Sequence, residues 1–319
     1  MNNVINGMMG LSMGDALGVP VEFMKREELK RKPVESMLGY GTHNQPAGTW
    51  SDDTSMSLCL LDSLSQGLDY QDIMIKFLNW YVEGAYTPYG EVFDMGGTTR
   101  KALDRFVKGT PPLKCGGSSE RDNGNGSLMR ILPLVFYIEA NYGRDLKEED
   151  EVFNIIHNVS SLTHAHKRSH VACAIYIAIA SKLLTSMNLK TAVESGINKA
   201  AEYYKNHTDY VEELAYFKRL QKRNFADLPE HSIKSSGYVV DTLEAAVWCL
   251  LNSSTYKECV LKAVNLGEDT DTVAAVAGGL AGLYYGYEGI PPKWLDTLAK
   301  RDYIENLCNR FYISLSQGC

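Results

Sequence analysis

The chain has 319 residues, of which 45% are hydrophobic and 22% are charged, and its formal net charge is −7. These values are ordinary for a globular protein with a sizeable core, and they allow one large domain spanning residues 1–319. The negative charge excludes a broad basic surface for nucleic acid or anionic lipid.

The first predicted element is a helix over residues 5–17 that contains several glycines. Glycine lowers helix propensity but lets another backbone approach closely, so this helix is expected to lie at a crowded centre. Glu22 then follows between Val21 and Phe23. A carboxylate buried in such surroundings would need a cation or a hydrogen-bond donor, whereas the simpler interpretation is a solvated surface residue.

An acidic pair, Asp52 and Asp53, precedes the next helical pattern, over residues 55–64. Further helices are predicted where apolar residues recur with a period of 3.6, over residues 70–84, 189–204 and 243–251. Alternating strand patterns of useful length are hard to find. The sequence therefore predicts an all-α fold built from a dozen or so helices.

The longest irregular stretch, Gly109 to Ser127, contains two glycine-rich segments ahead of an apolar helix predicted over residues 128–138. A glycine-rich backbone leading into a helix N-terminus presents free N–H groups and the positive end of the helix dipole, which suits a phosphate or pyrophosphate. The stretch lacks both the Walker and the dinucleotide-binding glycine patterns. A flexible loop with an asparagine cap accounts for the same residues equally well.

Three of the seven histidines lie together, at positions 164, 166 and 170. His166 and His170 are four residues apart and could bind zinc on a helix, but no third ligand is evident and the adjacent basic side chains disfavour a cation. A polar entry to a buried helix over residues 171–180 is the better interpretation. Among the three, His164 is best placed to face a pocket.

Two later segments are read as structural. The basic run from Lys218 to Arg223 is taken to be the solvated face of a helix. Tyr238 follows a turn of small residues, and a tyrosine in such a place is more often core than a platform for a ligand.

Residues 266–272 read Leu-Gly-Glu-Asp-Thr-Asp-Thr and lead into an uncharged helix predicted over residues 273–287. Asp269 and Asp271 could converge on one hard divalent cation, with Thr272 adding a hydroxyl oxygen. An EF-hand loop is excluded because apolar residues occupy the places of its next ligand and its glycine. Taken alone, an aspartate here is most simply a helix cap.

The presence of a second acidic cluster favours a metal site over a simple helix cap. If Asp52 and Asp53 meet Asp269 and Asp271 in space, four carboxylates crowd one site and need cations to compensate their charge, which two divalent ions would do. The two clusters are far apart in the sequence, so spacing alone leaves open whether they meet.

Three features missing from the sequence indicate the cellular compartment of the protein. The cysteines are scattered without a Cys-x-x-Cys pair, which indicates reduced thiols in a cytoplasmic protein. The N-terminal residues carry no basic region ahead of an apolar run, so no signal peptide is predicted. The uncharged stretch 273–287 falls short of the about 18 residues that a membrane span requires, so no membrane partner is expected.

Six short motifs follow one another along almost the whole chain. They are Gly14–Gly18 with Glu22, Thr49–Thr54, Gly124–Arg130, Thr163–His166, Gly237–Thr242 and Gly267–Thr272. In this order and spacing they resemble the ADP-ribosylglycohydrolase family, and within it the bacterial branch typified by dinitrogenase reductase-activating glycohydrolases. The resemblance implies an all-α orthogonal helix bundle in which the two aspartate clusters meet around a central binuclear Mg²⁺ or Mn²⁺ centre.

The same resemblance implies roles for individual residues. The expected metal ligands are Ser51, Asp52, Asp53, Asp269, Asp271 and Thr272. The expected catalytic residues are Glu22, Asp53 and Asp122, and the expected substrate contacts are Asp122, Asn125, Gly126, His164 and Tyr238. Ser51 stands where relatives often have threonine, which preserves the hydroxyl, and residues 115–121 follow no family pattern.

The activity implied by the resemblance is a metal-dependent hydrolase, a glycosidase that releases ADP-ribose from modified protein side chains. Arginine is the expected linkage, because an acidic Asp122 suits a guanidinium leaving group. The alternatives are a hydrolase of serine-linked or nucleic-acid-linked ADP-ribose, and a metal phosphohydrolase that cleaves the pyrophosphate. A non-catalytic ADP-ribose-binding, immunity or structural protein is a further alternative. The expected partners are an ADP-ribosylated protein as substrate and ADP-ribose as product.

Overall fold

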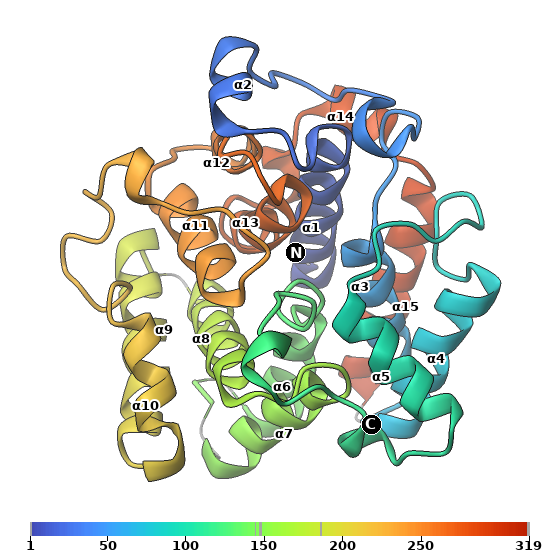
Figure 1. Ribbon diagram of the computed structural model, residues 1–319, viewed down its shortest axis with the longest axis vertical. Helices are drawn as coiled ribbons and strands as arrows, with labels where there is room; N and C mark the ends of the chain where they lie inside the picture. The colour runs from blue at the N-terminus through green and yellow to red at the C-terminus, as the bar shows by residue number, and fades with distance from the viewer. Residues whose placement is uncertain (1, 144, 147–148, 186, 318–319) are drawn as a thin grey trace.

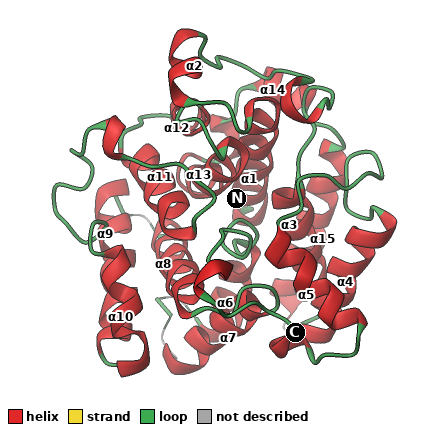
Figure 2. Cartoon of the chain, viewed as in Figure 1, coloured by secondary structure: helices red, strands yellow, loops and turns green. Residues whose placement is uncertain are grey.

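The computed structural model describes residues 2–143, 145–146, 149–185 and 187–317. Within these residues the chain forms fifteen α-helices joined by loops and short 3-10 turns, and it forms no strand beyond three isolated β-bridges (Figure 2). The predicted all-α class is therefore confirmed.

The α-helices of the described residues are as follows. They are α1 (Asn3–Gly18), α2 (Arg26–Arg31), α3 (Asp52–Leu64), α4 (Tyr70–Glu83), α5 (Gly97–Val107), α6 (Pro133–Tyr142), α7 (Glu149–Ser161), α8 (Lys167–Leu183), α9 (Leu189–Lys205), α10 (Val211–Leu214), α11 (Val239–Leu251), α12 (Tyr256–Val264), α13 (Thr270–Tyr285), α14 (Pro292–Thr297) and α15 (Arg301–Gln317).

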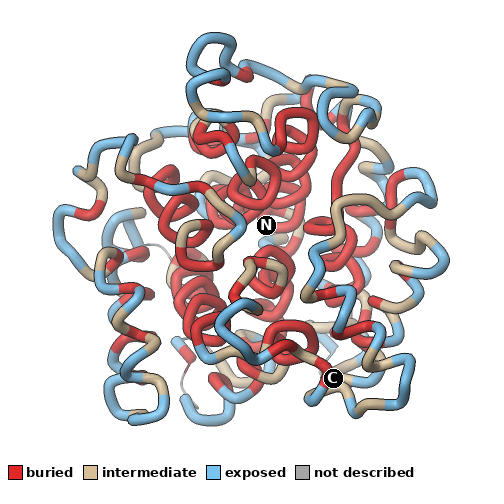
Figure 3. The backbone as a smooth tube through the Cα atoms, in the orientation of Figure 1, coloured by how far each residue is buried: buried red, intermediate tan, exposed pale blue. Residues whose placement is uncertain are grey.

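Helices α1 and α13 pack together at the centre of the molecule, and almost every residue of both is buried (Figures 1 and 3). Their backbones touch where both carry small residues. A Cβ atom built on Gly14 would lie 2.0 Å from the carbonyl oxygen of Ala274, and one built on Gly10 would lie 2.3 Å from that of Gly278. The crowded centre predicted from the glycines is thus the crossing of these two helices.

The remaining helices surround this pair. α3, α12 and α15 contact α1, while α8, α11 and α12 contact α13, so the buried apolar side chains form one continuous cluster. As a result, the C-terminal half of α1 and the N-terminal ends of α3 and α13 come together, and each of these segments carries at least one aspartate.

The structure corrects two local predictions. The apolar segment expected to be a helix from residue 128 forms turns up to residue 132, and α6 begins at Pro133, because proline is favoured at the first helical position. The basic run Lys218 to Arg223 forms turns and no helix. By contrast, Gly109 to Ser127 is irregular apart from two 3-10 turns, as predicted.

None of the helices in the described residues has both the length and the apolar character needed to cross a membrane. The six cysteines of the described residues are all buried and free of disulfides.

Candidate active site

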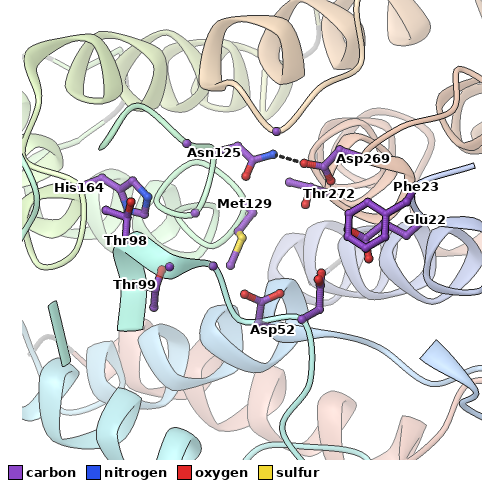
Figure 4. A pocket seen from close by; sticks show the side chains of 16 residues that line it. Glu22, Phe23, Asp52, Thr98, Thr99, Asn125, Met129, His164, Asp269 and Thr272 are labelled. Atoms are coloured by element: carbon purple, nitrogen blue, oxygen red, sulfur yellow. Dashed lines mark hydrogen bonds between the residues drawn. The ribbon is translucent and has the colours of Figure 1, made fainter. Parts of the chain in front are cut away.

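A cavity of about 250 Å³ opens where the N-terminal ends of α3, α5 and α13 meet the loop that precedes α6 (Figure 4). Glu22, Asp52 and Asp269 lie around one part of it, and His164 and Thr98 lie on the side away from Glu22. Four carboxylates line the cavity, those of Glu22, Asp52, Asp94 and Asp269, and its lining residues include no lysine or arginine. The cavity is thus strongly acidic.

The two aspartate clusters meet beneath this cavity. Asp53 lies in the first turn of α3 and Asp271 in the first turn of α13, and both are fully buried. Carboxylate oxygens of Asp15, Asp53 and Asp271 lie within 4.8 Å of one another, as do those of Glu22, Asp269 and Asp271. Because Asp271 belongs to both groups, the groups define two adjoining positions for a cation.

The start of α3 is held in place by Asp15. Its carboxylate accepts hydrogen bonds from the backbone N–H of Ser51 and of Thr54 and from the Thr54 hydroxyl, at 2.6 to 3.1 Å. Ser51 in turn caps α3, since its hydroxyl oxygen accepts from the Asp53 N–H at 3.3 Å. Backbone capping, the simplest role for an aspartate before a helix, therefore falls to Asp15 and Ser51, and Asp53 keeps one buried oxygen without a partner.

Three of the carboxylates have only one of their two oxygens paired with a protein donor. Within the described residues, one oxygen each of Asp53, Asp269 and Asp271 is buried without a hydrogen-bond partner. A buried carboxylate oxygen without a partner carries a desolvation penalty of roughly 1 to 3 kcal/mol, and more when charged. Each of these aspartates belongs to one or both of the close carboxylate groups, and carboxylate oxygens are the donors that a hard divalent cation prefers.

The pKa values of the cluster reflect the same excess of negative charge. Burial, reinforced by mutual repulsion, raises the pKa of Asp52, Asp53 and Asp271 well above the usual range, and burial raises that of Asp269. Burial likewise raises the pKa of Glu22 to about 8, with Asp269 contributing. Divalent cations would remove the repulsion and keep these groups ionised. The residues present therefore fit a metal centre.

We expect Mg²⁺ or Mn²⁺ to raise the melting temperature of the protein and EDTA to reverse the gain. A ligand that binds only the folded state at about 100 times its Kd stabilises it by roughly 2.7 kcal/mol, which corresponds to about 4 °C for a chain of this size. Differential scanning fluorimetry with and without each metal measures the shift, and Na⁺ at equal ionic strength is the control. An unchanged melting curve, with calorimetry showing no binding at millimolar metal, would contradict the assignment.

Glu22 also faces a second group. Its carboxylate contacts His43 Nε2, and His43, Glu22 and Asp94 have side-chain ligand atoms within 4.8 Å of one another. The backbone of Asp94 has a φ of +58°, an uncommon conformation for a residue other than glycine. Burial and the neighbouring Glu22 raise the pKa of Asp94 to about 8. Asp94 extends the acidic cavity toward the surface.

Asn125 and Gly126 line the cavity, as expected for substrate contacts. Asn125 has a further role that the sequence did not indicate, because its side-chain amide donates to Asp269 at 2.8 Å and to the Thr242 hydroxyl at 2.9 Å (Figure 4). It thereby fixes the orientation of Asp269. Gly126 is required by close packing, since a Cβ there would lie 2.7 Å from His164 Cε1.

Asp122 lies beside the cavity and does not line it. Its carboxylate accepts from the backbone N–H and the hydroxyl of Ser119, at 3.0 and 2.6 Å, and from the Thr98 hydroxyl at 3.4 Å. The Ser119 hydroxyl is the main cause of the lowered pKa of Asp122. Asp122 thus links its own loop to Thr98 by hydrogen bonds, and Thr98 does line the cavity.

His164 lines the cavity in its neutral form. Burial, with the nearby Arg130 contributing, lowers its pKa to about 3. Arg130 donates to the Thr163 hydroxyl oxygen at 2.7 Å, and that hydroxyl lies 2.9 Å from His164 Nδ1. Since the Thr163 hydroxyl has one proton and two acceptor sites, it can pair with either tautomer of the imidazole. His164 therefore presents a neutral imidazole beside Gly124 and Gly126.

Tyr238 is half-buried at the rim. It forms a β-bridge with Gly124, and its neighbour Gly237 lines the cavity. The Arg168 guanidinium lies 5.9 Å from the Tyr238 ring centre and 3.5 Å from that of Tyr216.

His166 and His170 do not share a metal. His166 caps α8 by accepting the backbone N–H of Arg168, whereas His170 stacks on His157, with ring centres 4.9 Å apart. The interpretation of this segment as a polar entry to a buried helix agrees with that geometry.

Sequence reasoning missed three contributors to the site. The sequence places Asp15 within a motif without assigning it a role, and it does not single out Asp94 or the start of α5. Gly96, Gly97, Thr98 and Thr99 line the cavity at the N-terminus of α5, where no described side chain caps the helix. The Gly-Gly-Thr-Thr sequence was the available signal for that helix start, while nothing in the sequence marked Asp94.

Comparisons with known proteins agree with this site. Residues 1–318 match the model of the ADP-ribosylglycohydrolase family. The chain is 33% identical to the ADP-ribosylarginine hydrolase Tri1 of Serratia proteamaculans, covering 96% of this chain and 77% of that protein. It is 31% identical to the ADP-ribosyl-[dinitrogen reductase] glycohydrolase of Rhodospirillum rubrum, covering 93% and 90%. A solved structure titled ADP-ribosylglycohydrolase-related protein complex superposes with a TM-score of 0.78 at 31% identity, covering 98% of both chains.

Proposed function

This chain belongs to the ADP-ribosylglycohydrolase family, and we propose that it is a metal-dependent hydrolase that releases ADP-ribose from modified arginine side chains of proteins. The observation that carries the proposal is the set of unpartnered, buried carboxylate oxygens beneath an acidic cavity. We further propose that the whole chain acts as one catalytic domain in the cytoplasm, where its buried free thiols are stable.

Two divalent cations, Mg²⁺ or Mn²⁺, complete the proposed site. When bound, they would polarise ribose oxygens and lower the pKa of a water molecule. The residues proposed to hold them are Ser51, Asp52, Asp53, Asp269, Asp271 and Thr272. Asp15 positions the start of α3, and Asn125 orients Asp269, so the ligands are held by partners of their own.

The charge of the cavity supports an arginine linkage. Burial is the main cause of the raised pKa of Asp94 and of Asp271. The charge of Glu22 adds to the rise at Asp94, and the charges of Glu22 and Asp94 add to the rise at Asp271. A guanidinium placed beside Glu22 and Asp94 would relieve the repulsion between their charges and present planar donors that a carboxylate accepts in pairs. A serine oxygen carries no such charge.

Neutral donors are proposed to hold the pyrophosphate, because no basic residue lines the cavity. The uncapped N-terminus of α5 offers backbone N–H groups and the positive end of a helix dipole, and His164 offers a neutral imidazole. At about 250 Å³ the cavity is smaller than the roughly 300 to 1,000 Å³ typical for a whole small-molecule ligand. We therefore place the ribose and phosphates inside it and the adenine at the rim near Tyr238.

Glu22 is the preferred candidate for the proton acceptor. Cleavage transfers the ribose C1 from the arginine nitrogen to water, so the attacking water must lose a proton. Glu22 lines the cavity, whereas Asp53 lies beneath it, so Glu22 is the one of the two that a water molecule in the cavity can reach. Asp122, the third candidate, is engaged with Ser119.

We expect the protein with Mg²⁺ or Mn²⁺ to release intact ADP-ribose from ADP-ribosyl-arginine faster than from ADP-ribosyl-serine. Hydrogen bonds to charged groups contribute roughly 1.5 to 3 kcal/mol, so the ratio of kcat/KM should be about tenfold to a hundredfold. Mass spectrometry of the products measures both rates. AMP among the products would instead indicate cleavage of the pyrophosphate.

Two variants separate the acidic candidates for arginine recognition. Asp94→Asn removes a carboxylate charge from the cavity lining and should reduce the preference for arginine. Asp122→Ala removes the hydrogen bonds from Ser119 and Thr98. It should lower the hydrolysis rates of the arginine-linked and serine-linked substrates together, so the ratio of these rates should fall less than in Asp94→Asn. Equal or faster cleavage of the serine-linked substrate by the unmodified protein would overturn the arginine assignment.

A further inference from the structure

A second hollow adjoins the active-site cavity. This outer groove has a volume of about 560 Å³ and is lined by residues 81–84, residues 90–95 and Arg100. Asp94 lines both the groove and the active-site cavity, so the two hollows meet at this residue. The groove is therefore within reach of the polypeptide that carries a side chain held at Asp94.

Close packing and hydrogen bonds fix the backbone around the groove. Gly84 ends α4 with a φ of +67°, and a Cβ built on it would lie 2.2 Å from the carbonyl oxygen of Gly90. The Thr87 hydroxyl donates to the Gly84 carbonyl oxygen at 2.6 Å and accepts from the Gly90 N–H at 2.8 Å. The loop that forms one wall is thus folded back on the end of the helix that forms the other.

The groove is acidic and open. Glu83 and Glu91 are exposed, and neither forms an ion pair anywhere in the described chain. Glu83 is the last residue of α4, where the helix dipole favours a cation, so its charge opposes the local electrostatics. With Asp94 the groove carries three carboxylates against one guanidinium, that of Arg100, and Val82 adds an apolar side chain that is 68% exposed.

We propose that the outer groove binds the stretch of substrate polypeptide that flanks the modified side chain, and that it selects basic residues there. The assignment rests on the proposed function, because it takes the substrate to be a protein whose modified residue is held at Asp94. Complementarity of charge identifies the occupant, since three carboxylates attract lysine and arginine neighbours and repel nucleic acid. The groove therefore acts on the choice of target protein and leaves the chemical step unchanged.

The test uses two synthetic peptides of equal length, each with one central ADP-ribosyl-arginine, flanked by lysines in one and by glutamates in the other. Free ADP-ribosyl-arginine is the third substrate. We expect the lysine peptide to have the higher kcat/KM. The double variant Glu83→Gln/Glu91→Gln should lower that value by about threefold to tenfold, and should leave hydrolysis of free ADP-ribosyl-arginine unchanged. High salt should remove the preference in the unmodified protein, because exposed charges are then screened.

Glu202→Gln is the matched control, since Glu202 is exposed on α9, on the opposite side of the molecule from α4 (Figure 1). Equal rates on the two peptides, or a double variant that slows free ADP-ribosyl-arginine as much as the lysine peptide, would overturn the groove assignment. If the arginine-linked substrates are all inert, the proposed linkage fails, and the same peptide pair carrying ADP-ribosyl-serine then tests the groove separately. If the double variant bound an unmodified lysine peptide as tightly as the unmodified protein does, the groove assignment would also be contradicted.

Discussion

Substitution of Asp271 by asparagine is expected to lower kcat/KM by about a thousandfold or more. Asp271 is the carboxylate shared by both three-residue groups, and it keeps one buried oxygen without a partner. Metal ions contribute several kcal/mol to transition-state stabilisation, and each 1.36 kcal/mol is a factor of ten in rate. Removing the charge common to both positions should therefore affect both.

The fold should survive this change. Asparagine has the shape of aspartate, and its carbonyl oxygen can still accept the Thr272 N–H that Asp271 accepts at 2.9 Å. We expect the variant to melt at about the same temperature as the unmodified protein in EDTA and to lose most of the stabilisation by Mg²⁺ or Mn²⁺. Asp302→Asn, at an exposed site on α15, is the control for the loss of one charge. Full turnover by Asp271→Asn would refute its role in holding metal.

Substitution of Gly14 by alanine is expected to cost about 3 to 5 kcal/mol of the free energy of unfolding. The added Cβ would lie 2.0 Å from the Ala274 carbonyl oxygen and 2.5 Å from its carbonyl carbon. Both are backbone atoms, so no side-chain rotation relieves the overlap and the two central helices must separate. Overpacking of a core typically costs roughly 1 to 3 kcal/mol, and a clash of two backbones belongs at or above the top of that range.

Urea denaturation followed by circular dichroism measures this loss. Gly97→Ala is the matched control, because it also lies in a helix and its added Cβ would meet no atom within 4 Å. That change should alter stability by less than about 1 kcal/mol, in the stabilising direction, since alanine favours the helix. If Gly14→Ala cost no more than the control, the close crossing of α1 and α13 would be wrong.

The elements that sequence reasoning located are those whose residues carry their own signal. Glycines in the first helix and small residues in the segment after Asp271 indicated close backbone packing, which is what α1 and α13 show. Asp52 and Asp271 stood out because each belongs to a cluster of acidic residues and hydroxyls at the start of a predicted helix, and the chain has two such clusters. The contact between their two clusters joins segments far apart in the sequence, and hydrophobic periodicity carries no information about such contacts. The expectation that the clusters meet came from the resemblance to a family.

The parts that were missed depend on tertiary context. Asp94 lies in a segment without helical period, and its place in the cavity follows from the path of a loop that Thr87 and Gly84 close. The start of α6 was placed too early because apolar residues 128–132 fit a helical pattern, although Pro133 marked the true beginning. Asp122 has an acidic side chain in the expected loop, but its hydrogen bonds to Ser119 turn it toward its own backbone.

The crossing of α1 and α13 also governs how the protein is made. The Thr270 hydroxyl donates to the carbonyl oxygen of Gly18 across 252 residues of sequence. At a synthesis rate of about 5 to 20 residues per second, α1 leaves the ribosome about 10 to 50 s before the helix that covers it. During that interval its apolar, glycine-rich surface has no native partner, and contacts of such long sequence separation fold slowly. We therefore expect the native packing of α1 to form only after α13 has been synthesised.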